Sequence, residues 1–181
     1  MSTKDEILNR VYARALESDR DYHGCSQSVL DSIQREFLIG NKEVLKSATV
    51  LSGGLLRQGE TCGAIVGAMM ALGLVMGRDR IEDSKTYRDA KAPCREVYDR
   101  IKEELKREFG FEGELESTLC RDIQEKVYGR PFKMWDRDDY QAFLDAGGHS
   151  ETGCPKVCAI AARVAAERIM ELIWVPSEMV P

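Results

Sequence analysis

The sequence is poor in the features that mark several large classes of protein. Only 7% of its 181 residues are aromatic, and 26 Lys and Arg residues are outnumbered by 31 Asp and Glu residues. Nucleic-acid binding depends on clustered Lys and Arg, so a net charge of −5 argues against a nucleic-acid partner. The first residues are charged rather than apolar, so we expect no secretory signal and a cytoplasmic location.

Long hydrophobic runs are also missing. The longest uncharged stretch covers residues 61–77 and contains four glycines. A membrane span needs about 20 apolar residues, so we expect none and interpret this stretch as a buried, Gly/Ala-rich central helix. Gly63 and Gly67 lie four residues apart in it. Such small residues let another backbone approach closely, either within one chain or across a homodimer.

Apolar residues recur at helical spacing along most of the chain, and no segment alternates with period two. We therefore predict one compact all-α domain over residues 1–181, a bundle of about six to eight helices without an internal repeat. Residues 78–92 are charged and weakly patterned. The predicted helices cover residues 4–18, 25–37, 41–51, 61–77, 93–109, 117–127, 138–145 and 154–175.

The six cysteines are Cys25, Cys62, Cys94, Cys120, Cys154 and Cys158. They form no CxxC pair, which argues against a zinc ribbon or thioredoxin motif, and no CxxCH, which argues against covalent haem. Permanent disulfides are not expected in a reducing cytoplasm. One interpretation is that the cysteines are small buried hydrophobic residues.

The positions of the cysteines favour a second interpretation. All except Cys158 fall at or beside the start of a predicted helix, where free N–H groups and the helix dipole favour thiolate. Several such ends facing one site would hold an anionic metal–thiolate cluster. Cys154 and Cys158 are four residues apart, so their Cβ atoms would be about 5–6 Å apart in a helix, wider than the roughly 3.5–4.5 Å of a disulfide.

Several segments together resemble the C_GCAxxG_C_C family of redox-active proteins, over residues 22–166. The resemblance implies a compact helical protein with four characteristic cysteines. A similar domain occurs in split-Soret cytochromes c with a proposed iron–sulfur site, but this chain lacks their haem-binding motif. Cys94 and Cys158 depart from the family pattern. The segments are Gly24-Cys25-Ser26-Gln27-Ser28-Val29, Ser52-Gly53-Gly54, Gly59-Glu60-Thr61-Cys62-Gly63-Ala64-Ile65-Val66-Gly67-Ala68, Cys120-Arg121-Asp122 and Cys154-Pro155-Lys156-Val157.

Three functional hypotheses follow. The leading one is a redox or electron-transfer protein, of oxidoreductase type, with an iron–sulfur cluster on four thiolates and a redox partner protein or small-molecule electron donor. The second is a metal-free thiol–disulfide redox protein or sensor. The third is a helical interaction module with a structural Cys₄ zinc site. The cofactor-binding residues would be Cys25, Cys62, Cys120 and Cys154, with Cys158 as a substitute ligand.

These hypotheses make a geometric prediction. The four ligand sulfurs should meet at one site, with Cys158 close by and Cys94 as the outlier. His23 and His149 precede Cys25 and Cys154 by two and five residues. They are ligands or proton carriers in one interpretation, and polar loop residues in the simpler one.

Overall fold

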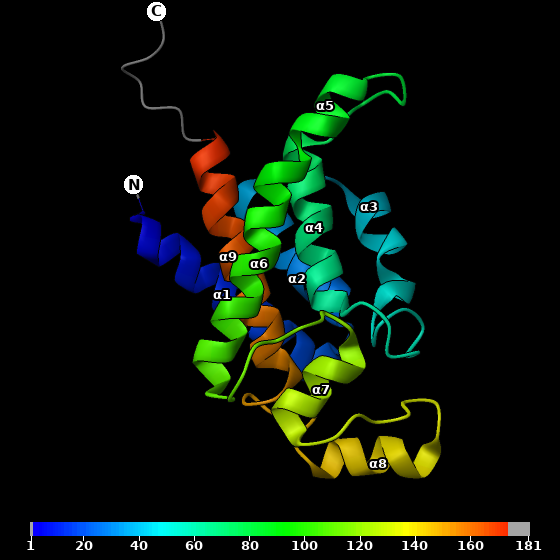
Figure 1. Ribbon diagram of the computed structural model, residues 1–181. Coiled ribbons are helices and arrows are strands. Elements are labelled where there is room, and N and C mark those ends of the chain that lie inside the picture. The colour runs from blue at the N-terminus through cyan, green and yellow to red at the C-terminus, as the bar shows by residue number, and fades with distance from the viewer. Residues whose placement is uncertain (1, 174–181) are drawn as a thin grey trace, which may run out of the picture.

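The computed structural model describes residues 2–173, which form an all-α structure (Figure 1). The predicted fold class is therefore confirmed. The last two residues of the final predicted helix, 174 and 175, lie outside the described residues. The helices are α1 (Lys4–Tyr22), α2 (Cys25–Phe37), α3 (Lys42–Ser47), the 3₁₀ turn η1 (Thr49–Leu51), α4 (Gly63–Met76), α5 (Ser84–Asp89), α6 (Lys91–Phe109), α7 (Cys120–Tyr128), α8 (Arg137–Asp145) and α9 (Cys154–Ile173).

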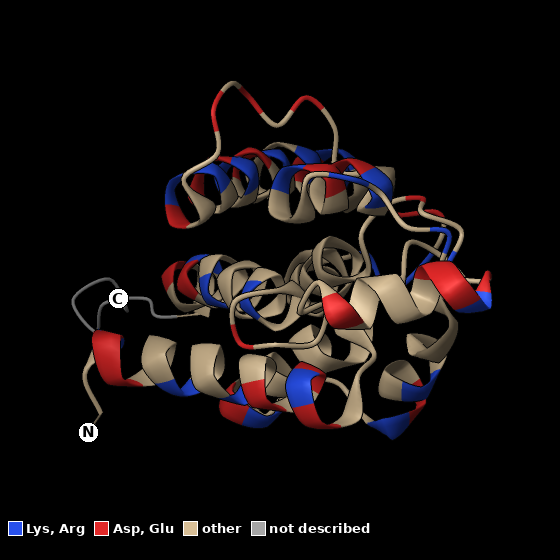
Figure 2. Cartoon of the chain, turned by 90° about the horizontal axis from the view of Figure 1, so that it is seen from below, with Lys and Arg blue, Asp and Glu red and all other residues tan. Residues whose placement is uncertain are grey.

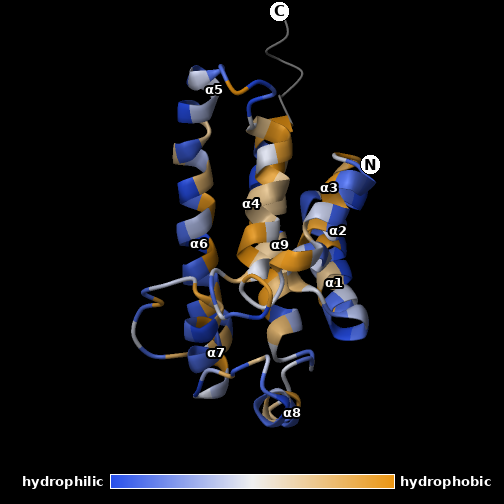
Figure 3. Ribbon diagram, turned by 90° about the vertical axis from the view of Figure 1, so that its right-hand side faces the viewer, coloured by the Kyte–Doolittle hydropathy of each residue, from blue (hydrophilic) through white to orange (hydrophobic). Residues whose placement is uncertain are grey.

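Helix α9 lies at the centre and packs against α1, α2, α4 and α6. Helices α4 and α9 are the most hydrophobic elements, whereas α6 and α8 are largely hydrophilic (Figure 3). The inward side of α4 is built from small residues such as Ala64, Gly67 and Ala68, which are buried, so its backbone approaches its neighbours closely. No described helix combines the length and the apolarity that crossing a membrane requires.

Helix α6 covers one side of the bundle. Val97, Ile101 and Leu105 form its buried stripe at spacings of four residues, and Lys, Arg, Asp and Glu occupy the rest of its surface (Figure 2). Apolar residues at this spacing face the core together, and the opposite face is left to charged side chains. In Figure 1, α7 and α8 lie beyond the end of the bundle at which α9 begins.

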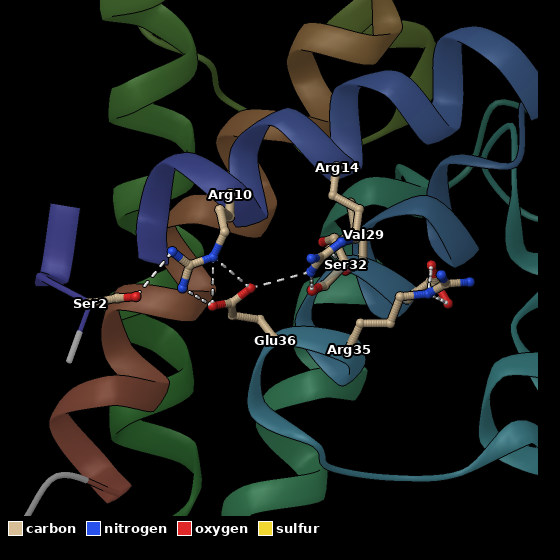
Figure 4. Close-up of polar contacts among 8 residues, drawn as sticks. Ser2, Arg10, Arg14, Val29, Ser32, Arg35 and Glu36 are labelled. Atoms are coloured by element: carbon tan, nitrogen blue, oxygen red, sulfur yellow. Dashed lines mark hydrogen bonds and ion pairs between the residues drawn. The ribbon is translucent and has the colours of Figure 1, made fainter. Parts of the chain in front are cut away.

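An ionic contact fixes α2 against α1 (Figure 4). The Glu36 carboxylate of α2 accepts hydrogen bonds from Arg10, at 2.5 Å from Nη2, and from Arg14. Arg14 also donates to the Ser32 carbonyl at 3.1 Å. Hydrogen bonds from Arg10 are the main reason that the pKa of Glu36 is lowered. These contacts join the middle of α1 to the C-terminal half of α2.

The element boundaries differ from the prediction in several places. Helix α6 begins two residues earlier than predicted, at Lys91, and α7 begins three residues later, at Cys120. Helix α1 continues past Ser18 to Tyr22, and the predicted helix at 41–51 divides into α3 and η1. Helix α4 begins at Gly63, because Thr61 instead pairs with Leu119 in an isolated β-bridge. A short helix, α5, lies in the weakly patterned stretch 78–92, where the Asp83 side chain caps it by accepting from the Thr86 N–H.

Candidate functional site

Five of the six cysteines line a single cavity of about 90 Å³ at the start of α9. Four of them stand at helix starts: Cys25, Cys120 and Cys154 are the first residues of α2, α7 and α9, and Cys62 is the N-cap of α4. Cys158 lies one turn inside α9 and is fully buried. The structure therefore brings together the four predicted sulfur ligands and the predicted substitute.

Cys94 does not line this cavity. It lies in the first turn of α6, and its thiol contacts the Met76 sulfur at 3.5 Å. Cys94 was the expected outlier, and the structure places it apart from the other five.

A short antiparallel pairing brings Cys62 and Cys120 together although they are 58 positions apart in the sequence. The Cys62 N–H donates to the Thr118 carbonyl at 2.9 Å, and the Cys120 N–H donates to the Glu60 carbonyl at 2.6 Å. Thr61 and Leu119 form the bridge between these two bonds. The start of α4 and the start of α7 are thus held side by side, each with a cysteine at its first turn.

Two glycines allow the cysteine-bearing segments to approach closely. A Cβ atom on Gly63 would lie only 2.5 Å from Cys25 Sγ, and one on Gly54 would lie 2.7 Å from Cys120 Cβ. The interpretation of the glycine motif as a close-approach device is therefore confirmed for Gly63. The glycines at positions 53, 54 and 59 form no backbone cradle for a phosphate, because the N–H groups of residues 55–59 donate to backbone carbonyls.

Several donors point at the cysteine sulfurs. The N–H of Gly53 faces the Cys25 sulfur, and the N–H groups of Ala64 and Ile65 at the start of α4 face the Cys62 sulfur. The Tyr128 hydroxyl of α7 lies 3.3 Å from Cys154 Sγ and accepts from the Cys154 N–H at 2.8 Å. Donors aimed at sulfur stabilise a thiolate and tune a metal bound to it.

The expectation that helix starts would favour free thiolates is wrong. Burial raises the pKa of the Cys25 thiol to about 12. The thiol pKa values of Cys62, Cys120, Cys154 and Cys158 are also raised, chiefly by burial, although the N–H groups at the start of α4 oppose this at Cys62. Removing water destabilises a thiolate by more than the N–H groups at the helix starts stabilise it. Without a bound cation these groups are protonated thiols.

Sequence reasoning missed Asp19, which lines the same cavity. This carboxyl is 1% exposed, its Oδ1 has no hydrogen-bond partner among the described residues, and burial raises its pKa to about 6. The signal was present in the sequence. Leu8, Val11, Ala15 and Asp19 form the buried stripe of α1 at helical spacing, so extending the predicted helix by one turn would have placed this acid inside. Tyr128 carried no such signal.

The two histidines also lie at the cavity wall. Their rings stack with centroids 3.8 Å apart, and His149 Nδ1 is 4.0 Å from Asp19 Oδ2. Burial, with the nearby charges of His23 and Arg57, lowers the pKa of His149 to about 4. Both histidines thus lie beside the cysteines, as their interpretation as ligands or proton carriers required. His149 is neutral at pH 7.

A family model described as "Putative redox-active protein (C_GCAxxG_C_C)" matches residues 23–168, which is most of the chain. The chain belongs to this family. Among curated proteins and among solved structures, nothing matches the chain significantly. The resemblance inferred from the sequence is therefore confirmed, and the segments that carry it are those that surround the cysteine cavity.

The donor set of this family member suits some metal centres better than others. Within residues 2–173, no group of three or more His, Cys, Asp or Glu side chains is arranged to hold a single metal ion. A structural zinc ion needs four thiolates about 2.3 Å from one centre, so the side chains as placed do not fit it. An iron–sulfur cluster is instead held by cysteine thiolates around several irons, and five thiols line this cavity.

Backbone strain is concentrated beside the cavity. Gly53, Gly54, Leu55, Leu56 and Arg57 all have positive φ, between 51° and 68°, and form one left-handed turn between η1 and Cys62. Each non-glycine residue in this conformation costs roughly 1–2 kcal/mol. The turn carries Gly53 to the Cys25 sulfur and Arg57 to the cavity wall.

This strain predicts an unusual ranking of substitutions. Leu56→Gly should be more stable than Leu56→Ala by about 1 kcal/mol, because both remove the same half-exposed side chain and only glycine relieves the φ of 51°. At Leu144, which lies in the regular helix α8, the alanine variant should instead be the more stable of the two by about 1 kcal/mol. Urea unfolding measures both pairs. An alanine variant at position 56 more stable than the glycine variant would show that the turn is unstrained.

Proposed function

We propose that this chain is a redox protein in which Cys25, Cys62, Cys120 and Cys154 hold an iron–sulfur cluster within the cavity at the start of α9. The observation that carries the proposal is the convergence of these cysteines from four separate helix starts onto one cavity. Hydrophobic burial alone gives no reason for thiols spread over most of the sequence to meet. A cysteine-ligated cluster gives one, because it requires four thiolates around a common centre.

The protein's own groups support thiolate ligation. Backbone N–H groups face the sulfurs of Cys25 and Cys62, and the Tyr128 hydroxyl lies next to the sulfur of Cys154. A bound cluster would supply one-electron transfer. These residues would hold the thiolates in place and reduce the cost of their negative charge, and the apolar surroundings of the cavity would keep water away.

The metal-free thiol–disulfide alternative is less well supported. Thiol exchange requires a thiolate that is accessible to its partner. Three of the cavity cysteines are buried and two, Cys25 and Cys154, are partly buried, and the thiol pKa values of all five lie above their usual range. Iron cations displace the thiol protons on binding, so the same burial that disfavours exchange is compatible with ligation. Cys158, fully buried beside the Cys25 carbonyl, would be the substitute ligand.

The direct test is the metal content of the protein purified without oxygen. We expect iron and acid-labile sulfide in the chain and a visible absorption band that is bleached by reduction. Free thiols without iron, titrating as five or six per chain, would contradict the cluster and favour the dithiol hypothesis. Zinc in place of iron would favour the structural metal hypothesis and require the sulfurs to close around one ion.

A further inference from the structure

A groove of about 510 Å³ adjoins the cysteine cavity on the outer side of α7 and α8. It is formed by the end of the left-handed turn, the first turn of α7 and the loop that joins α7 to α8. Arg57 and Met134 line both the groove and the cysteine cavity, so the two spaces are neighbours. No cysteine lines the groove, and nothing proposed above assigns it a role.

The charge of the groove is positive although the chain as a whole is negative. Its lining contains four cationic side chains and a single acid, Asp139. Arg121 is paired with Glu60 at 3.1 Å, and Arg130 with Asp139 at 2.7 Å. Among the described residues, the Arg57 and Lys133 side chains form no ion pair. The Arg57 guanidinium lies over the Tyr140 ring at 4.8 Å, and Asp139, the partner of Arg130, also accepts from the Lys133 N–H at 2.7 Å. The two side chains without an ion pair match the charge of a phosphate monoester.

The groove also presents flat hydrophobic surface. The Trp135 side chain lines it and is 66% exposed, which is unusual for the largest apolar residue. Beside it, the Arg130 guanidinium lies over the Phe132 ring at 4.3 Å. An exposed indole next to arginine offers a stacking surface for a planar heterocycle.

We propose that this groove binds a nucleoside phosphate, with its phosphate at Arg57 and Lys133 and its base on Trp135. The volume lies within the roughly 300–1,000 Å³ of small-molecule sites. A concave pocket with two free cations suits one small anion better than a nucleic-acid strand, which needs a continuous basic track. The bound phosphate would lie beside the wall that Arg57 contributes to the cysteine cavity.

The test is isothermal titration of the full chain with AMP and with FMN, which share a phosphate and differ in their planar ring. At low salt we expect saturable binding of at least one, weakening as salt rises. Adenosine and inorganic phosphate, titrated separately, should each bind at least about tenfold more weakly, because adenosine lacks the phosphate and inorganic phosphate lacks the planar ring. The readout is heat of binding, so it is independent of iron content.

Matched variants locate the site. Arg57→Gln with Lys133→Gln, and separately Trp135→Ala, should each weaken binding about tenfold or more. Lys85→Gln, an exposed lysine on α5 far from the groove in sequence, should not. Thermal unfolding checks that each variant is folded.

No saturable heat with millimolar AMP or FMN would overturn the proposal. Phosphate binding as tightly as AMP, or equal binding by the Trp135 variant, would overturn the stacking part.

Discussion

Replacing Gly67 with leucine is expected to lower the free energy of unfolding by more than about 2 kcal/mol, and alanine alone should be enough to destabilise the fold. Gly67 is buried in α4, where α4 crosses α2. A Cβ atom there would overlap the Ser26 carbonyl oxygen and lie 3.1 Å from Val29 Cβ. The first obstacle is backbone rather than a flexible side chain, so relief requires α2 to move. Overpacking of this kind costs roughly 1–3 kcal/mol.

The same helix provides the control. Nothing lies within 4 Å of a Cβ atom placed on Gly73. Gly73→Ala should therefore raise the free energy of unfolding by up to about 1 kcal/mol, because alanine is the better helix former. Urea unfolding followed by circular dichroism measures both variants. If Gly67→Ala is as stable as wild type, then α2 and α4 are further apart than the structure places them.

Serine substitution of Cys25, Cys62 or Cys120, three of the four proposed ligands, is expected to remove most of the iron from anaerobically purified protein. With one thiolate removed, the remaining cysteines would be too few to ligate all the irons of a cluster. Cys94→Ser is the matched control, since Cys94 contacts Met76 outside the cavity, and it should keep the wild-type iron content. Iron and sulfide per chain, with the visible spectrum, are the measurements.

Cys158→Ser separates the two candidates on α9. If Cys154 is the ligand, the Cys158 variant keeps the wild-type iron content, and the Cys154 variant keeps only the iron that Cys158 holds as the substitute ligand. The reverse result would transfer the ligand role one turn along α9, to the fully buried thiol beside the Cys25 carbonyl. Retention of iron in all four single variants of the proposed ligands would contradict the proposed centre. Thermal unfolding of each variant shows whether iron loss is accompanied by loss of the fold.

The fold class and part of the cysteine site could be predicted from the sequence. The helical spacing of apolar residues predicted the all-α class, and the missing charges in residues 61–77 predicted the apolar helix α4, although α9 rather than α4 lies at the centre of the bundle. The glycine spacing around Cys62 predicted a close approach, and Gly63 meets the Cys25 sulfur. Each of these inferences concerns residues near one another in the chain, where local spacing decides which side chains share a face.

Other parts of the site could have been predicted but were not. Asp19 continues the buried stripe Leu8–Val11–Ala15, and only the early end given to the first helix kept it on the surface. The left-handed turn was beyond prediction, because Leu55, Leu56 and Arg57 disfavour positive φ. Hydrogen bonds to the preceding residues hold them there: the Leu55, Leu56 and Arg57 N–H groups donate to the carbonyls of residues 51, 50 and 52 at 3.3, 2.9 and 3.2 Å.

The sequence by itself determined most of the helices, the burial of α4 and the placing of the cysteines at or beside helix starts, because those properties follow from neighbouring residues. The tertiary structure alone decided that Cys62 lies beside Cys120, that Tyr128 reaches Cys154, and that the thiol pKa values are raised. Contacts between distant segments depend on how whole helices pack. The ionisation of a thiol depends on the water that this packing removes, which no local pattern records.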